Sequence, residues 1–243
     1  MTEDIYGTAL LDYQQGNYSE DIITYVNVGG EEEKDVLPLP YLFRTYNEMP
    51  SLEKKALSLC KGTILDIGAG AGSHSLHLQE KGKEVTALDI SKGAFEVCKA
   101  RGIKNCLHGN VLDLKHQKFD TILALMNGAG MCGKLKTLAP FLKHLKTLLK
   151  SKGQILLDSS DIIYMYEDEE GDHWIPSDLP YYGEVIFKVA YKNKEEKPFP
   201  WMYIDFNTLQ RCAHDNGFDC KLIQEGAHYD YLAQLTLREQ PKD

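Results

Sequence analysis

Short apolar runs alternate with segments of helical periodicity through the middle of the chain. Five such runs predict strands, at residues 63–67, 84–89, 103–108, 119–125 and 153–158. Apolar residues spaced i, i+3, i+4 predict the intervening helices, at residues 73–81, 91–102 and 135–149. Near-continuous apolar strands separated by helices are typical of a parallel sheet that is covered on both faces. The pattern therefore predicts a doubly wound α/β fold.

The segments on either side of this region have a different character. Residues 1–60 combine a polar stretch, two closely spaced prolines and a helical rhythm, and we expect a helical cap or lid there. Residues 61–243 form the predicted main domain, with an insertion at about 159–205 that carries a hairpin. Two further strands, at residues 218–224 and 229–237, complete a mostly parallel sheet of seven strands.

Composition and charge limit the classes of binding partner that we expect for this chain. The net charge of −9 argues against nucleic acid and anionic membranes, because binding to either needs a field of Lys and Arg. The N-terminus has no secretory pattern and no apolar stretch approaches ~20 residues, so the cytoplasm is the expected compartment. The six cysteines include no C-x-x-C pair, which indicates reduced thiols and no structural metal site.

A glycine-rich turn follows the first of the five strands. Gly68, Gly70 and Gly72, with Ala69 among them, lead directly from that strand into a helix. Such a turn lets backbone N–H groups approach a ligand closely, since no Cβ stands in the way. Dinucleotide-binding turns follow G-x-G-x-x-G, but the third glycine position is Ser73 here. Asp66, two residues before the turn, would repel a pyrophosphate and attract an ammonium group.

The next strands supply further candidates for a nucleoside site. Asp89 ends the second strand, where a carboxylate can accept both hydroxyls of a ribose, and Ile90 follows it. After the third strand, Asn110 is placed to bond an adenine edge and Val111 to lie against its face. Asp113 is an alternative adenine partner if the loop is shifted. His74, in the helix after the glycine turn, is the histidine placed nearest this site.

Residues 64–89 resemble the first two motifs of the class I S-adenosylmethionine-dependent methyltransferases. Residues 109–113, 119–127 and 149–158 are similar to the later motifs of that family, in the same order. The resemblance implies S-adenosylmethionine as cofactor, with its methionine part at Asp66 and the glycine turn. It places the ribose at Asp89. Family members often carry an aspartate at the position of Asn110.

The resemblance also implies where the methyl acceptor lies. Leu125, Met126 and Asn127 would lie beside the sulfonium methyl, and acceptor contacts are expected at the carboxyl ends of the strands. Candidate acceptor residues on those ends and in the N-terminal segment are Asn127, Asp158, Asp161, Tyr164, Tyr41, Arg44 and Tyr46. Methyltransferases that act on the amines of nucleic-acid bases carry Asn or Asp followed by two prolines and an aromatic residue at this place. Here Asn127 is followed by Gly128-Ala129-Gly130, so the resemblance does not support methylation of base amines.

We therefore expect a methyltransferase for a small-molecule acceptor, with no general base assigned and a homodimer left open. Two other functions remain compatible with the sequence. An NAD(P)-binding oxidoreductase would require glycine at position 73 and a hydride-transfer site further along the chain. A non-catalytic nucleotide-binding module would keep the pocket and lack turnover.

Overall fold

The computed structural model describes residues 3–238, so residues 1–2 of the predicted cap and 239–243 of the predicted main domain lie outside the described part. A seven-stranded sheet has the strand order β11-β12-β7-β6-β3-β4-β5. Its strands are β3 (Thr63–Ile67), β4 (Glu84–Asp89), β5 (Asn105–His108), β6 (Phe119–Ala124), β7 (Leu149–Ser160), β11 (Phe218–Glu225) and β12 (Asp230–Leu237). Strands β5, β4, β3, β6 and β7 are parallel, and β12 pairs antiparallel with both β7 and β11.

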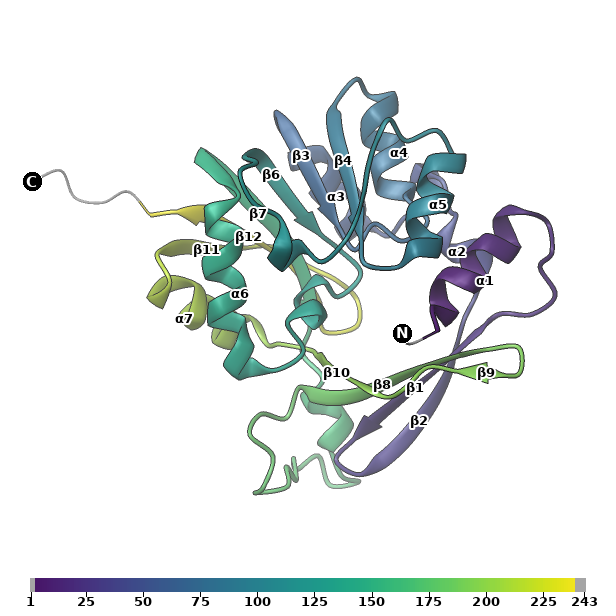
Figure 1. The fold of residues 1–243 in the computed structure, drawn as a ribbon. Coiled ribbons are helices and arrows are strands. Elements are labelled where there is room, and N and C mark those ends of the chain that lie inside the picture. Colours follow the sequence, from purple (N-terminus) through teal and green to yellow (C-terminus); the bar gives the residue numbers. More distant parts are fainter. Residues whose placement is uncertain (1–2, 239–243) are drawn as a thin grey trace, which may run out of the picture.

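Helices cover both faces of this sheet (Figure 1). Helices α6 (Leu135–Thr147) and α7 (Phe206–Asp215) pack on the face that carries Leu65 and Ile67 of β3. Helices α3 (Ser51–Leu59) and α4 (Ser73–Glu80) bury the opposite face, which carries Ile64. Helix α5 (Lys92–Ala100) places Cys98 against Ala87 of β4. The predicted doubly wound α/β fold is therefore confirmed.

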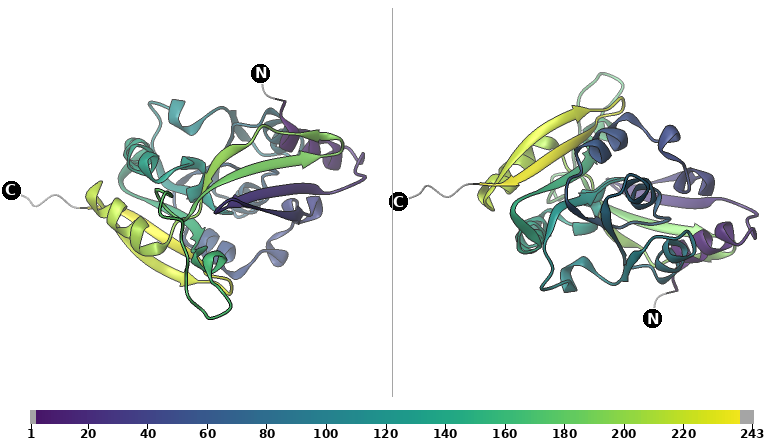
Figure 2. Two further views of the ribbon diagram at one scale, coloured as in Figure 1. Left: turned by 90° about the horizontal axis from the view of Figure 1, so that it is seen from below. Right: turned by 90° about the horizontal axis from the view of Figure 1, so that it is seen from above.

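A second sheet lies across the carboxyl ends of the parallel strands (Figure 1). Its strands are β1 (Ile22–Val28), β2 (Glu31–Leu37), β8 (Glu184–Tyr191), β9 (Lys194–Glu195) and β10 (Phe199–Met202). The order is β10-β8-β1-β2, and β9 pairs with β8. Figure 2 shows these N-terminal and inserted segments side by side, although they are far apart in sequence.

The prediction of a wholly helical N-terminal cap is wrong in one respect. Helices α1 (Ile5–Gln14), α2 (Leu39–Leu42) and α3 and the short η1 (Tyr46–Glu48) are present, but the β1–β2 hairpin separates α1 from α2. Gly29 and Gly30 turn this hairpin with φ of +59° and +98°. Strand β2 is a polar, exposed edge strand, so it lacks the apolar alternation that marks a strand in sequence. The inserted hairpin is present, but it pairs with β1 and does not stand alone.

Asp4 fastens α1 to α5 at the carboxyl edge of β4. One carboxylate oxygen accepts the Gly7 N–H at 2.9 Å, and the other accepts the Ser91 hydroxyl and the Gly93 N–H, both at 2.9 Å. Asp4 therefore caps the N-termini of two helices with one side chain. The Glu196 carboxylate accepts the N–H groups of Ile5 and Tyr6 at 3.1 and 3.2 Å, so α1 is also bonded to the segment between β9 and β10.

We expect Asp4→Ala to lower the free energy of unfolding by about 2 kcal/mol and the Tm by about 4–8 °C, because it removes two helix caps. Asp4→Ser should retain about half of this stability, since one hydroxyl can serve α1 but not both helices. Thermal unfolding followed by circular dichroism measures both. Equal Tm values for Asp4→Ala and the wild type would contradict the double cap.

No helix within residues 3–238 combines the length and the apolar character that crossing a membrane requires.

Candidate functional site

The glycine turn between β3 and α4 has the backbone conformation that only glycine adopts easily. Gly68, Gly70 and Gly72 have φ of +69°, +55° and +79°. The Gly68 N–H donates to the Leu88 carbonyl of β4 at 2.9 Å, which fixes the start of the turn. A Cβ on Gly70 would lie 3.2 Å from the Tyr6 hydroxyl of α1, and one on Gly68 would lie 3.3 Å from the sulfur of Met131. The turn therefore faces α1 and the loop after β6.

Asp66 and Asp89 stand on either side of this turn. Asp66 is buried and accepts the Ser75 hydroxyl at 2.6 Å, and burial raises its pKa. Asp89 accepts the Gly70 N–H on one carboxylate oxygen and the Ser91 N–H on the other, each at 2.8 Å. Burial raises the pKa of Asp89 as well, against the lowering effect of those two donors. The turn and Asp89 thus form one hydrogen-bonded unit, as the sequence pattern predicted them to be neighbours.

The loops after β4 and β5 place the candidate adenine contacts. Ile90 is 68% exposed, and its carbonyl bonds the His108 ring at 3.1 Å. Asn110 caps η2 (Val111–Asp113) by accepting the Leu112 N–H at 2.9 Å. Val111 is nearly buried and packs in the main core. The side-chain oxygen of Asn110 thus accepts one bond and keeps a second lone pair, so its oxygen and its NH₂ group can both reach a base.

The loop after β6 adopts a strained conformation that Asp158 holds. Met126 and Asn127 have φ of +63° and +60°, a region that non-glycine residues rarely occupy. Asp158, in β7, accepts the N–H groups of Met126 and Gly128 at 3.0 Å each. Leu125 points into the core, whereas the Met126 side chain is 40% exposed. The amide of Asn127 bonds to the Ser159 hydroxyl at 2.8 Å and the Met202 carbonyl at 3.2 Å, so it joins the two sheets.

A buried charge cluster joins α4 to the N-terminal segment. Arg44 donates to both carboxylate oxygens of Glu53, at 3.2 and 2.5 Å, and the His74 ring approaches the same carboxylate at 2.8 Å. All three residues are at most 7% exposed. The Arg44 guanidinium also stacks 4.0 Å from the Tyr41 ring centroid. The hydrogen bonds of Glu53 with His74 and Arg44 outweigh its burial, so the pKa of Glu53 is lowered.

Asp158 faces this cluster. The pKa of Asp158 is raised to about 6, because burial and, to a lesser extent, the Glu53 charge outweigh the lowering effect of the Gly128 and Met126 N–H groups and His74. Burial raises the pKa of Tyr41, and the charge of Asp158 adds to this rise. The structure thus gathers Tyr41, Arg44, His74 and Asp158 at the carboxyl ends of β3, β6 and β7.

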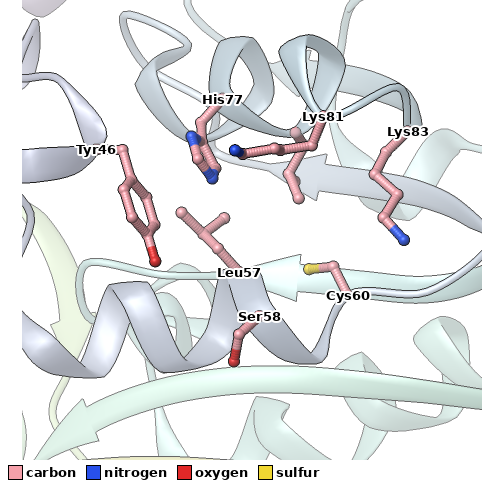
Figure 3. Close-up of a pocket in the computed structure, with 8 residues that line it drawn as sticks. Tyr46, Leu57, Ser58, Cys60, His77, Lys81 and Lys83 are labelled. Carbon is pink, nitrogen blue, oxygen red and sulfur yellow. The ribbon is translucent and has the colours of Figure 1, made fainter.

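Three predicted acceptor residues lie elsewhere. Tyr46 stacks on His77 with ring centroids 4.0 Å apart and lines a cavity of about 260 Å³ with Cys60 and Lys81 (Figure 3). Asp161 accepts the Ile163 N–H and the Tyr182 hydroxyl, at 3.0 and 2.8 Å, and so braces its own loop around η4 (Ile163–Tyr166). Tyr164 is 43% exposed and stacks on Tyr229.

Other residues at this edge carried no signal in the sequence. Glu53 sits in an ordinary amphipathic helix, and only its contacts with Arg44 and His74 reveal it. Trp201 of β10 packs on Gly130 in η3 (Gly128–Cys132), where an added Cβ would overlap the indole. Tyr6 reaches the glycine turn from α1. Long-range packing places all three, so a local pattern could not identify them.

Known methyltransferases are similar to this chain in sequence and fold. The family model described as "Methyltransferase domain" matches residues 65–157. The crystal structure of an S-adenosylmethionine-dependent methyltransferase from Bacteroides fragilis, in complex with S-adenosylhomocysteine, is 43% identical, with a TM-score of 0.89. The alignment covers 98% of this chain and 99% of that one.

Two further relatives are more distant. An uncharacterized methyltransferase of Staphylococcus carnosus (strain TM300) is 25% identical over 87% of this chain and 91% of its own length. The sugar N-methyltransferase KedS8 from Streptoalloteichus sp ATCC 53650 is 14% identical, with a TM-score of 0.54 over 77% of this chain and 85% of that one. At that identity the likeness shows the fold alone.

Proposed function

The chain belongs to the class I S-adenosylmethionine-dependent methyltransferases, and we propose that its methyl acceptor is a small molecule. Family membership excludes the two alternatives that the sequence left open. The cofactor is S-adenosylmethionine, which excludes the NAD(P)-binding oxidoreductase, and the chain is an enzyme, which excludes the non-catalytic module. The position of each cofactor group and the kind of acceptor are argued from this chain's own residues.

The glycine turn and its two carboxylates fit the cofactor. Each oxygen of Asp89 already accepts one backbone N–H and has a second lone pair for a ribose hydroxyl. Any Cβ on Gly68 or Gly70 would narrow the space that faces Met131 and Tyr6. In our proposal Asp66 and the turn hold the methionine part, and the exposed Ile90 lies against the adenine with Asn110 and Val111. When bound, the cofactor supplies an electrophilic methyl group on a sulfonium.

The observation that carries the small-molecule proposal is the cover over the carboxyl ends of the strands. Helix α1, the second sheet and the loop after β6 meet there through Tyr6 at Gly70, Trp201 at Gly130 and Met202 at Asn127. A polymer or a folded protein would need this edge open. We propose that residues 1–60 and the insertion at 159–205 act together as this cover, and that residues 61–158 and 206–243 bind the cofactor.

Label transfer from methyl-labelled S-adenosylmethionine tests the proposal. The enzyme is incubated with a cell extract divided by ultrafiltration into a metabolite filtrate and a retained fraction of protein and nucleic acid. We expect label in a metabolite of the filtrate. Label confined to the retained fraction, with the filtrate unlabelled, would refute the small-molecule acceptor.

A mutation of the cover should separate acceptor use from cofactor binding. Gly130→Ala places a Cβ against Trp201 and forces β10 away from the loop after β6. We expect methyl transfer to the filtrate to fall roughly tenfold, equivalent to about 1.4 kcal/mol. Affinity for S-adenosylhomocysteine, measured by calorimetry, should change by less than about a factor of two, which also shows that the variant is folded. Equal losses in both quantities would contradict a separate acceptor side.

A further inference from the structure

The charges at the carboxyl ends of the strands are unfavourable for an anionic acceptor. Asp66, Glu53, Asp89 and Asp158 bring four carboxylates to this edge. Arg44 is paired with both oxygens of Glu53 and also donates to the Tyr41 carbonyl at 2.6 Å. An acceptor that carries a carboxylate or a phosphate would meet these carboxylates without a guanidinium free to pair with it.

A second arginine near the glycine turn is also engaged. Arg101 donates to the Ala71 carbonyl at 2.6 Å and to the Ser73 hydroxyl at 3.2 Å. Its side chain thus braces the turn from the α5 side. A positively charged or neutral acceptor is the kind that this edge accommodates.

Asp158 has the geometry of a proton acceptor. Each of its oxygens accepts one backbone N–H at 3.0 Å, so the carboxylate is held in one orientation and keeps lone pairs for a ligand. The titratable groups that face it are Glu53 of α3, His74 of α4, Tyr41 of α2 and Tyr231 of β12. Its pKa of about 6 makes it ionised and still basic near neutral pH.

Three aromatic rings of the second sheet stand on the same face of that sheet. Register pairs Phe199 of β10 with Phe187 of β8, and Trp201 follows on the same side of β10. The ring centroids of Phe187, Phe199 and Trp201 lie 5.7–6.1 Å from one another. Each ring is partly exposed. Phe187 and Phe199 pack in the cluster that contains Ala71 of the glycine turn, and Trp201 packs on Gly130.

Aromatic faces of this kind attract cations and cover apolar groups. The rings belong to β8 and β10, strands of the second sheet, which lies across the carboxyl ends of the parallel strands (Figure 1). One acceptor chemistry matches both sides: a cationic group directed at Asp158 and an apolar body against the rings.

Resting on the proposed function, we propose that the acceptor is an amine with an apolar body, that its nitrogen is methylated, and that Asp158 accepts its proton. An ammonium group gives one N–H proton to the Asp158 carboxylate, which becomes a carboxylic acid. The neutral nitrogen then forms the N–C bond to the methyl group as the C–S bond breaks, and the electron pair of that bond stays on sulfur. The positive charge passes from sulfur to the methylated nitrogen, so atoms and charge balance.

Chemical blocking of amines tests the acceptor class. The metabolite filtrate is acetylated on its amines, and label transfer is compared with that into a mock-treated filtrate. We expect blocking to abolish at least nine-tenths of the transfer, a tenfold loss (about 1.4 kcal/mol). Unchanged transfer after blocking would overturn the amine proposal and leave the small-molecule proposal intact. A mock-treated filtrate without label would instead contradict the small-molecule proposal.

Ligand binding to the complex with S-adenosylhomocysteine tests the amine proposal without turnover. Calorimetry compares phenethylamine, phenethyl alcohol and hydrocinnamate, which share one apolar body and differ in the polar group. The amine should bind at least tenfold more tightly than the other two, and Asp158→Asn should remove that preference. Tighter binding of hydrocinnamate or of the alcohol would overturn the proposal.

The pH dependence separates a base from a structural carboxylate. Below pH 6 Asp158 is protonated and cannot accept a proton, so methyl transfer should rise with pH through about 6 and then level. Asp158→Asn should abolish this rise and lower the rate roughly 100-fold or more, while S-adenosylhomocysteine still binds. The matched control is Asp219→Asn on the exposed face of β11, which should keep the wild-type profile. A wild-type pH profile in Asp158→Asn would exclude Asp158 as the base.

Discussion

Asp89→Ala is expected to weaken binding of S-adenosylhomocysteine by roughly 10–100-fold, since it removes the two charge-assisted hydrogen bonds that we propose between Asp89 and the ribose. It also frees the Gly70 and Ser91 N–H groups that now donate to this carboxylate. The turn loses one of its bonds to β4 at the same time, while the Gly68 N–H still donates to the Leu88 carbonyl. Isothermal titration calorimetry on the purified, folded variant measures the loss directly.

A surface aspartate provides the control for this experiment. Asp215, at the end of α7, has a side chain that is 80% exposed, and Asp215→Ala carries the same change of charge. We expect its affinity for S-adenosylhomocysteine to match the wild type. If Asp89→Ala and Asp215→Ala bind equally well, Asp89 does not hold the ribose.

Gly72→Ala should lower the free energy of unfolding by about 2–4 kcal/mol, the sum of backbone strain and overpacking. Gly72 has φ of +79°, where an L-residue is strained. A Cβ there would also overlap the Ile103 side chain and lie 3.0 Å from the sulfur of Cys98. The close packing of α4 on α5 thus leaves room for hydrogen alone. Chemical denaturation measures the loss.

Gly82, just beyond the other end of α4, isolates the backbone contribution. Its φ of +75° is nearly that of Gly72, but no atom lies within 4 Å of an added Cβ. We expect Gly82→Ala to cost about 1 kcal/mol, which is the strain alone. Should the two variants lose equal stability, the crowding at Gly72 would have no part in fixing the turn.

The sequence predicted the parts of the fold that local pattern determines. Strand β3 is an apolar run that stops before Gly68, β4 is one that ends at Asp89, and Ser91 caps α5 as its position indicated. The glycine turn and Asp89 were both assigned to one nucleoside site, because a carboxylate at the end of the next strand can accept the hydroxyls of a ribose. The hydrogen bond between Gly70 and Asp89 agrees with that prediction.

The second sheet could not be predicted, because its pairings are non-local. Strand β1 pairs with β8, about 160 residues further along the chain, as in Thr24 opposite Val189. The polar sequence of β2 resembles a solvated loop, and only pairing with β1 makes it a strand. The sequence consequently could not show that the aromatic rings of Phe187, Phe199 and Trp201 form a group.

The structure does not bring all of the predicted acceptor residues together. Tyr46 was grouped with Tyr41 and Arg44 by proximity in sequence, but η1 turns it toward His77 and α4. Asp161 was grouped with Asp158, but β7 has ended and the carboxylate braces the following loop. The residue that does join this cluster, Glu53, comes from a helix with no distinguishing pattern.

A crystal structure of the protein with S-adenosylhomocysteine tests the central claim most directly. We predict that both ribose hydroxyls lie within hydrogen-bond distance of the Asp89 carboxylate, with the amino-acid part against residues 68–72 and Asp66. A nucleoside bound elsewhere, with the glycine turn packed only against protein, would contradict the account.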